Sequence, residues 1–107
     1  MTLNEINRLI YTNNVLKKIH IDMDTFTMKY NLLLILSSDK NLDKEILIHF
    51  YDITNLQLVE IGGGLTQLMH LKISEQNYGS DRNIFMIKDL DDGKLQFEFY
   101  SYDIKVD

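Results

Sequence analysis

The stretch IHIDMDTFTMKYNLLLIL, residues 19–36, decides the fold class because its apolar residues recur at every second position. Ile19, Ile21 and Met23 alternate with polar residues, as in a strand with one buried face. The alternation resumes after Thr25 and predicts a long second strand, whose buried face would carry Phe26, Met28, Tyr30, Leu32, Leu34 and Leu36. Two such strands joined by a short connection are expected to pair antiparallel.

The period of two continues toward the C-terminus and predicts further strands at 45–53, 65–73, 84–88 and from residue 95 onward. Residues 56–61 are read as either a strand or an irregular segment, and 74–82 as a polar loop. Asp91-Asp92-Gly93 predicts a hairpin turn, since Asp-Gly tolerates the left-handed backbone of such turns. In the last strand the apolar phase shifts by one residue, which predicts a β-bulge near Phe99 and Tyr100.

The N-terminal segment has a different period. Thr2 and Glu5 have the spacing of a capping box, and the apolar residues that follow lie on one face of a helix that ends at Asn13-Asn14: Leu3, Ile6, Leu9 and Ile10. The chain of 107 residues fits a single domain, 1–107. We therefore expect an α+β, predominantly β fold: a curved antiparallel sheet or half-barrel of about six or seven strands, with a short N-terminal helix packed against one face.

Composition narrows the class of function. The chain has no cysteine, which favours a reducing compartment, and we expect a cytoplasmic location. The net charge of −5 opposes nucleic-acid binding, which depends on Lys and Arg at phosphates, and permits a basic protein partner. The longest apolar run, Leu32–Leu36, is too short to cross a bilayer, so no membrane association is expected. The oligomeric state is left open.

Histidines and carboxylates on the predicted strands could form a metal site or a catalytic site. His20, Asp22 and Asp24 share one face of a strand and could hold a metal, but alternate residues lie about 7 Å apart, so a solvated face is the favoured interpretation. His49 and His70 lie on other strands, and no nucleophile motif accompanies them. We predict no catalytic residue, no metal and no cofactor. The alternative is a small-ligand-binding or weakly catalytic domain that uses His49, His70 or His20.

Aromatic and acidic residues gather near the C-terminus and indicate a protein interface. Tyr100 and Tyr102 fall on the same phase as Glu98, with Asp103 beside them. Tyrosine is enriched at interfaces, and acidic rim charges steer a basic partner. A bulge that returns both tyrosines to the core is an equally weighted alternative. The candidate partner-binding residues are Glu98, Tyr100, Tyr102 and Asp103, with Asp22 and Asp24 behind them.

The second half also carries a family pattern. It comprises the strand Ile46-Leu47-Ile48-His49-Phe50-Tyr51-Asp52-Ile53, the segment Leu68-Met69-His70-Leu71-Lys72-Ile73 after the glycines, and a hairpin from Ile84 to Tyr100 around the Asp-Gly turn. This arrangement resembles a family of small bacterial domains, some of which are immunity proteins encoded beside polymorphic or contact-dependent growth inhibition toxins. The resemblance implies a β-rich fold, no catalysis and a cognate toxin domain as the partner.

Together these observations predict a non-enzymatic binding protein. The leading hypothesis is an immunity protein that occludes the active site of a basic toxin domain, such as a nuclease. A structural scaffold or oligomer subunit is a third possibility, which an unpaired edge strand together with a dimer in solution would favour.

Overall fold

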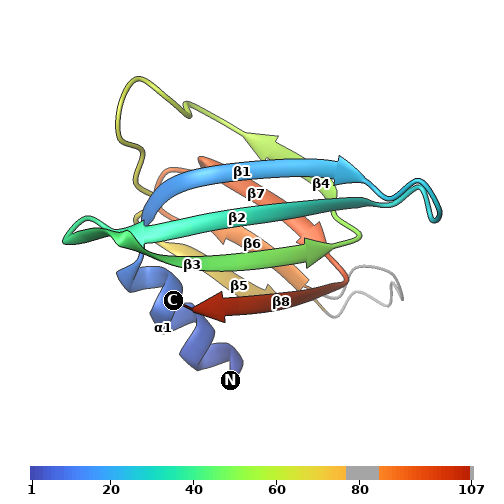
Figure 1. Cartoon of the computed structure of the whole chain (residues 1–107), viewed down its shortest axis with the longest axis horizontal. Helices are drawn as coiled ribbons and strands as arrows, with labels where there is room; N and C mark the ends of the chain where they lie inside the picture. Colours follow the sequence, from blue (N-terminus) through green and yellow to red (C-terminus); the bar gives the residue numbers. More distant parts are fainter. Residues whose placement is uncertain (77–84, 107) are drawn as a thin grey trace.

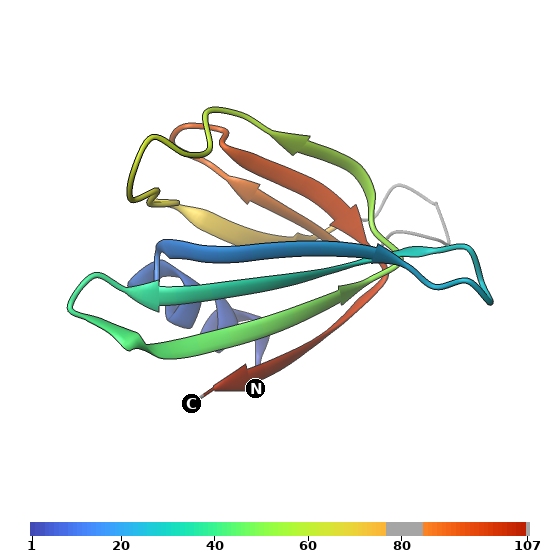
Figure 2. The same ribbon diagram turned by 45° about the horizontal axis from the view of Figure 1, so that its top comes forward.

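The computed structural model describes residues 1–76 and 85–106, and in these ranges it contains one helix and eight strands. The strands form two stacked four-stranded sheets, with the helix at one end (Figures 1 and 2). We call the sheet with strand order β1-β2-β3-β8 sheet A and the sheet with order β4-β7-β6-β5 sheet B; every strand pairing is antiparallel. The elements are α1 (Leu3–Thr12), β1 (Val15–Met23), β2 (Tyr30–Ser38), β3 (Asn41–Tyr51), β4 (Thr54–Leu58), β5 (Leu71–Glu75), β6 (Phe85–Asp89), β7 (Leu95–Phe99) and β8 (Ser101–Val106).

The predicted α+β, mainly β class and the antiparallel pairing are confirmed, whereas the single curved sheet is corrected to two sheets. The strand count is eight in the described residues, above the expected six or seven. Consecutive pairing holds for β1 to β3 and for β5 to β7. It fails where β3 pairs with β8 and β4 pairs with β7, because the chain passes from sheet A to sheet B after β3 and returns after β7.

The helix follows its sequence signals. Thr2 and Glu5 form the predicted capping box, and Asn13 caps the C-terminal end. Ile6 and Ile10 are buried in the core. The carboxamide of Asn7 pairs with the outer edge of β5: its Nδ2 donates to the Ile73 carbonyl at 2.9 Å, and its Oδ1 accepts from the Ile73 N–H at 2.7 Å. The helix therefore covers the β5 edge and does not lie on a sheet face as expected.

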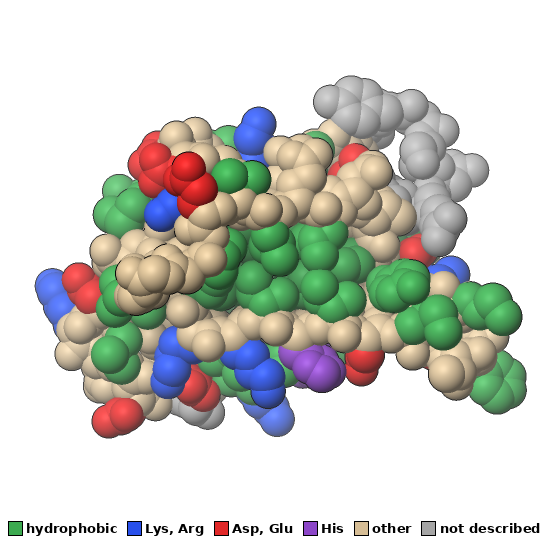
Figure 3. Space-filling model, turned by 90° about the horizontal axis from the view of Figure 1, so that it is seen from above, with side chains coloured by type: hydrophobic (Ala, Val, Ile, Leu, Met, Phe, Trp, Pro, Cys, Tyr) green, Lys and Arg blue, Asp and Glu red, His purple; other side chains and the backbone are tan. Residues whose placement is uncertain are grey.

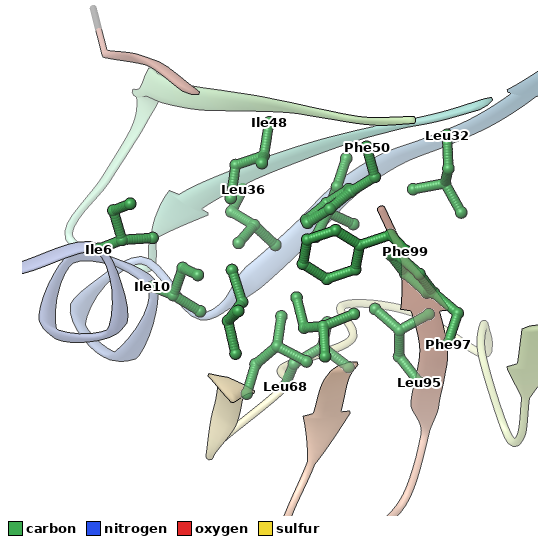
Figure 4. Packing of buried hydrophobic residues seen from close by; sticks show 14 of the residues in the cluster. Ile6, Ile10, Leu32, Leu36, Ile48, Phe50, Leu68, Leu95, Phe97 and Phe99 are labelled. Atoms are coloured by element: carbon green, nitrogen blue, oxygen red, sulfur yellow. The ribbon is translucent and has the colours of Figure 1, made fainter. Parts of the chain in front are cut away.

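The core fills the space between the sheets (Figure 4). Alternation on β3 directs Ile46, Ile48 and Phe50 inward. The Phe50 ring meets Phe97 and Phe99 of sheet B edge-on, with ring centroids 4.9 and 4.7 Å apart. Such edge-to-face pairs add to the free energy gained by burying the rings. These contacts join the two sheets through one cluster.

The phase shift near Phe99 is a change of sheet. Phe99 ends β7 in sheet B, Ser101 begins β8 in sheet A, and Tyr100 lies between them. The Tyr100 N–H donates to the Tyr51 carbonyl at 3.0 Å, at the point where β3 leaves sheet A. The predicted bulge is therefore wrong, and the one-residue shift marks the crossing between layers.

Two predicted strands begin later than expected. The second strand begins at Tyr30, because residues 24–29 form the turn of a β1–β2 hairpin. The strand predicted at 65–73 is reduced to β5, and only Thr66–Leu68 contacts β1, through a bridge between Val15 and Gln67. The Asp91-Asp92-Gly93 turn is confirmed, with Gly93 at φ 65°. Most of the loop predicted at 74–82, and the first residue of the strand predicted at 84–88, lie outside the described residues.

No helix in ranges 1–76 and 85–106 is long and apolar enough to cross a membrane.

Candidate protein-binding surface

The β1–β2 hairpin projects from one end of the molecule (Figures 1 and 2). It carries exposed apolar side chains. Asp24 builds the turn: its Oδ1 accepts from the Phe26 N–H at 2.8 Å, and its carbonyl accepts from the Met28 N–H at 2.7 Å. Met28 adopts a left-handed backbone, with φ 60°. Phe26 is 97% exposed and Met28 is 74% exposed, and Met23 and Tyr30 are also exposed. We call residues 23–30 the apolar hairpin.

An apolar groove lies where the two sheets are open to solvent, between β1 and the segment that runs from Leu58, at the end of β4, to Thr66. It has a volume of about 490 Å³, and its apolar lining includes Ile19, Ile21, Leu58, Ile61 and Leu65. Figure 3 looks down on this side and shows hydrophobic side chains along the hollow. Ile21 also borders a second depression with Tyr30, Ile53 and Leu56, so apolar surface continues from the groove to the base of the hairpin. We call this region the open side.

The six sequence-predicted binding residues do not form one surface. Glu98 lies on β7 in sheet B, where its carboxylate accepts from Asn55 Nδ2 at 3.1 Å. Asp103 lies on β8 in sheet A and accepts from the Tyr51 hydroxyl at 3.0 Å. Tyr100 is exposed at the crossing between sheets. Tyr102 is half-buried and packs against Phe99 and Phe85, with ring centroids 5.8 and 5.6 Å apart. The expectation that Tyr102 shares an exposed face with Glu98 is wrong, since β7 and β8 belong to different sheets.

Of the other two predicted residues, Asp22 directly precedes the apolar hairpin and Asp24 lies within it. Asp22 is on β1 one residue before the hairpin, with its carboxylate 3.8 Å from His20 Nε2. Asp24 is the turn-forming residue described above. The hairpin and its flank therefore carry two carboxylates, Asp22 and Asp24, and one cation, Lys29, whose Nζ lies 3.8 Å from Asp52 Oδ2.

A polar cluster occupies the outer face of sheet A. The rings of His49 and Tyr51 stack with centroids 6.4 Å apart, and Tyr51 donates to Asp103. This hydrogen bond, together with partial burial and the charge of Asp103, raises the pKa of the Tyr51 phenol. The phenol therefore stays protonated and acts as a donor through the physiological range.

The three histidines do not converge. His20 and His49 lie in one row across sheet A but are separated by Leu33 of β2. His70 precedes β5, with Nδ1 3.8 Å from Asp91 Oδ1 and its ring against Tyr11. Among the described residues, no group of three His, Asp or Glu side chains is arranged to hold a metal ion.

The apolar hairpin and the open side were missed by sequence reasoning. Phe26 and Met28 continue the alternation of the buried face. The pattern therefore predicted a strand where the structure has a turn. The available signal was Asp24-Thr25-Phe26-Thr27, since Asp commonly accepts from the backbone two residues on in a turn.

Comparisons with protein-family models, with curated proteins and with solved structures found no match to this chain. The resemblance to bacterial immunity proteins therefore stays a prediction.

Proposed function

We propose that this domain is a non-enzymatic binding protein whose apolar hairpin inserts into a cleft of a partner protein. The observation that carries this proposal is the exposure of Phe26 and Met28 at the end of a projecting, hydrogen-bonded turn. Aromatic residues and Met are enriched at protein interfaces, and a few buried anchors supply most of the binding free energy. The turn holds these anchors before binding, so little conformational entropy is lost on association.

We further propose that the partner is a basic toxin domain, such as a nuclease, which the hairpin neutralises by filling its active-site cleft. The resemblance to immunity proteins and the net charge of −5 support this choice. Asp22 and Asp24 would face a positively charged cleft while Phe26 fills it, which gives steric and electrostatic occlusion together. The absence of cysteine agrees with a site of action in the cytoplasm.

Affinity capture from a lysate of the source organism tests the proposal. Wild-type protein, Phe26→Asp and Leu90→Asp serve as parallel baits, and bound proteins are identified by mass spectrometry. Leu90 is the matched control because it is an exposed leucine in a different turn. We expect wild type and Leu90→Asp to retain one basic protein, and Phe26→Asp to lose it.

Equal capture by Phe26→Asp would contradict the proposal, as would the absence of any bound protein on folded wild-type bait. Circular dichroism of each bait confirms that the fold is unchanged, which is expected because Phe26 contributes nothing to the core.

A further inference from the structure

The edge strands of the two sheets differ in how they are covered. The β5 edge is covered by Asn7 of α1. The β1 edge is covered at its start, where the Leu16 N–H donates to the Thr66 carbonyl at 2.9 Å and the Leu68 N–H donates to the Asn14 carbonyl at 2.7 Å. Within the described residues, no strand other than β2 pairs with β1 beyond this point. With respect to residues 1–76 and 85–106, the edge from Lys18 to Asp22 is therefore open to another strand.

The register of β1 with β2 determines which backbone groups face outward. The Asp24 N–H bonds to the Lys29 carbonyl, and hydrogen-bonded and non-hydrogen-bonded pairs alternate along an antiparallel ladder. Ile19 and Ile21 therefore occupy non-hydrogen-bonded positions opposite β2, with their N–H and C=O groups on the free edge. Their side chains face the open side of the molecule.

We propose that this edge binds β1 of a second copy of this chain, antiparallel and with its two-fold axis at His20. In this register Ile19 exchanges backbone hydrogen bonds with the partner's Ile21, and the two A sheets become one continuous sheet. Lys18 then lies directly opposite the partner's Asp22, and Asp22 opposite the partner's Lys18. A two-fold pairing makes each contact twice, so this charge complementarity is specific to a second copy.

The open side offers apolar surface to such a dimer. Ile21, Leu58, Ile61 and Leu65 are each at least 40% exposed there, so several aliphatic side chains lie beside the paired edge. Antiparallel neighbours direct paired side chains to the same side of a sheet, so the open sides of both copies meet across the axis.

The bulge between Leu16 and Lys18 and the turn at Asp24 limit the pairing to one short segment. The pairing therefore closes on a dimer and does not propagate along the edge. The apolar hairpin lies beyond the paired segment, so this inference does not rest on Phe26 or Met28, although both proposals use Asp22.

A charge-swap series measured by sedimentation velocity tests the dimer. Lys18→Asp and Asp22→Lys each place like charges opposite one another, and the double variant restores opposite charges in the reverse order. Lys105→Asp is the control, since Lys105 lies on β8 at the other edge of the same sheet. We expect each single variant to raise the dimer dissociation constant about tenfold, and the double variant to return it to within about threefold of wild type.

A wild-type chain that stays monomeric throughout the concentration range would overturn the inference. So would a dimer that is indifferent to all three β1 variants, or one that dissociates with Lys105→Asp, since that result places the interface at β8. Far-ultraviolet circular dichroism of each variant excludes unfolding as the cause of dissociation.

Discussion

Tyr51 and Asp103 show how a single hydrogen bond sets a titration on the outer face of sheet A. The bond exists only while the phenol is protonated, and ionisation would place a phenolate beside a carboxylate. The pKa of Tyr51 is raised for these reasons, with partial burial adding to the effect. The folded chain therefore holds this proton to higher pH than the unfolded chain, whose tyrosines titrate near about 10. The resulting stabilisation is complete below that pH and is lost as the pH rises through the folded pKa.

We predict that Asp103→Asn lowers the pKa of Tyr51 toward its ordinary value. An NMR titration of ¹³C-labelled tyrosine, with Tyr51→Phe used to assign the resonance, measures the change. Asp22→Asn is the control, because it removes a carboxylate on β1 that does not contact Tyr51. An unchanged Tyr51 titration in Asp103→Asn would show that the hydrogen bond does not set the pKa.

Phe26 shows why residue type alone did not reveal exposure. Alternation predicts a buried side chain at this position, but the Asp24 carboxylate gives the backbone of residues 26 and 27 a local partner, and a turn forms instead of a ladder. An aromatic residue in that turn gains nothing from the fold. Phe26 is thus an aromatic side chain that the fold leaves in solvent, and this exposure is the reason for choosing the apolar hairpin as the candidate site.

At the scale of elements, α1 covers the outer edge of β5, because the Asn7 carboxamide bonds to backbone groups that a neighbouring strand would otherwise pair with. Its capping box and apolar stripe could be predicted from the sequence, because both depend on spacing within a few residues. Its docking place could not, because the contact joins Asn7 to Ile73, which are far apart in the chain. Asn7 falls on the polar side of the sequence pattern, and nothing local marks it as a partner of a strand edge.

We predict that Asn7→Ala destabilises the protein by about 1–3 kcal/mol, because it leaves the Ile73 N–H and carbonyl without their partner on a covered edge. Urea unfolding measures the change in free energy. Arg8→Ala, on the exposed side of the same helix, is expected to change stability by less than about 0.5 kcal/mol. Equal effects of the two substitutions would mean that the helix is held by its apolar face alone.

The local sequence pattern predicted which segments are strands better than it predicted where each strand begins and ends or which strands pair. The β3 and β7 segments were recognised because alternation and burial agree there. The β1 segment was recognised from alternation alone, since Ile21 and Met23 are exposed. The strand at 65–73 was overestimated, since Gly62 to Gly64 all adopt positive φ and the chain re-enters the sheet only at Leu71. The phase shift at Tyr100 was detected, but a period-two pattern cannot distinguish a bulge from a change of sheet.

At the scale of the whole molecule, stability depends on how the sheets meet. The rings of Phe50, Phe97 and Phe99 form the contact between them, and all three are fully buried. Each of these rings sits at an inward phase of a strand, so its burial follows from the alternation. Alternation does not place the rings in opposite layers, because pairing between strands distant in the chain leaves no local signature.

We predict that Phe50→Ala lowers the free energy of unfolding by about 3–5 kcal/mol, the usual cost of removing a buried ring. Phe26→Ala makes the same chemical change at an exposed position and should alter stability by less than about 0.5 kcal/mol. Denaturant melts of the pair provide the comparison. A large loss in Phe26→Ala would mean that the apolar hairpin packs on the body of the protein in solution.

The strand order also determines when each strand can find its partner during synthesis. β1, β2 and β3 are made consecutively and can pair as they leave the ribosome, yet the outer edge of β3 stays unpaired until β8, the last of the eight described strands, has been made. During that interval Ile46, Ile48 and Phe50 have no sheet B to cover them, because all of its strands are also still to come. The nascent chain thus presents an apolar, incomplete sheet until β4 to β8 have been made, and chaperones and aggregation compete for it during that period.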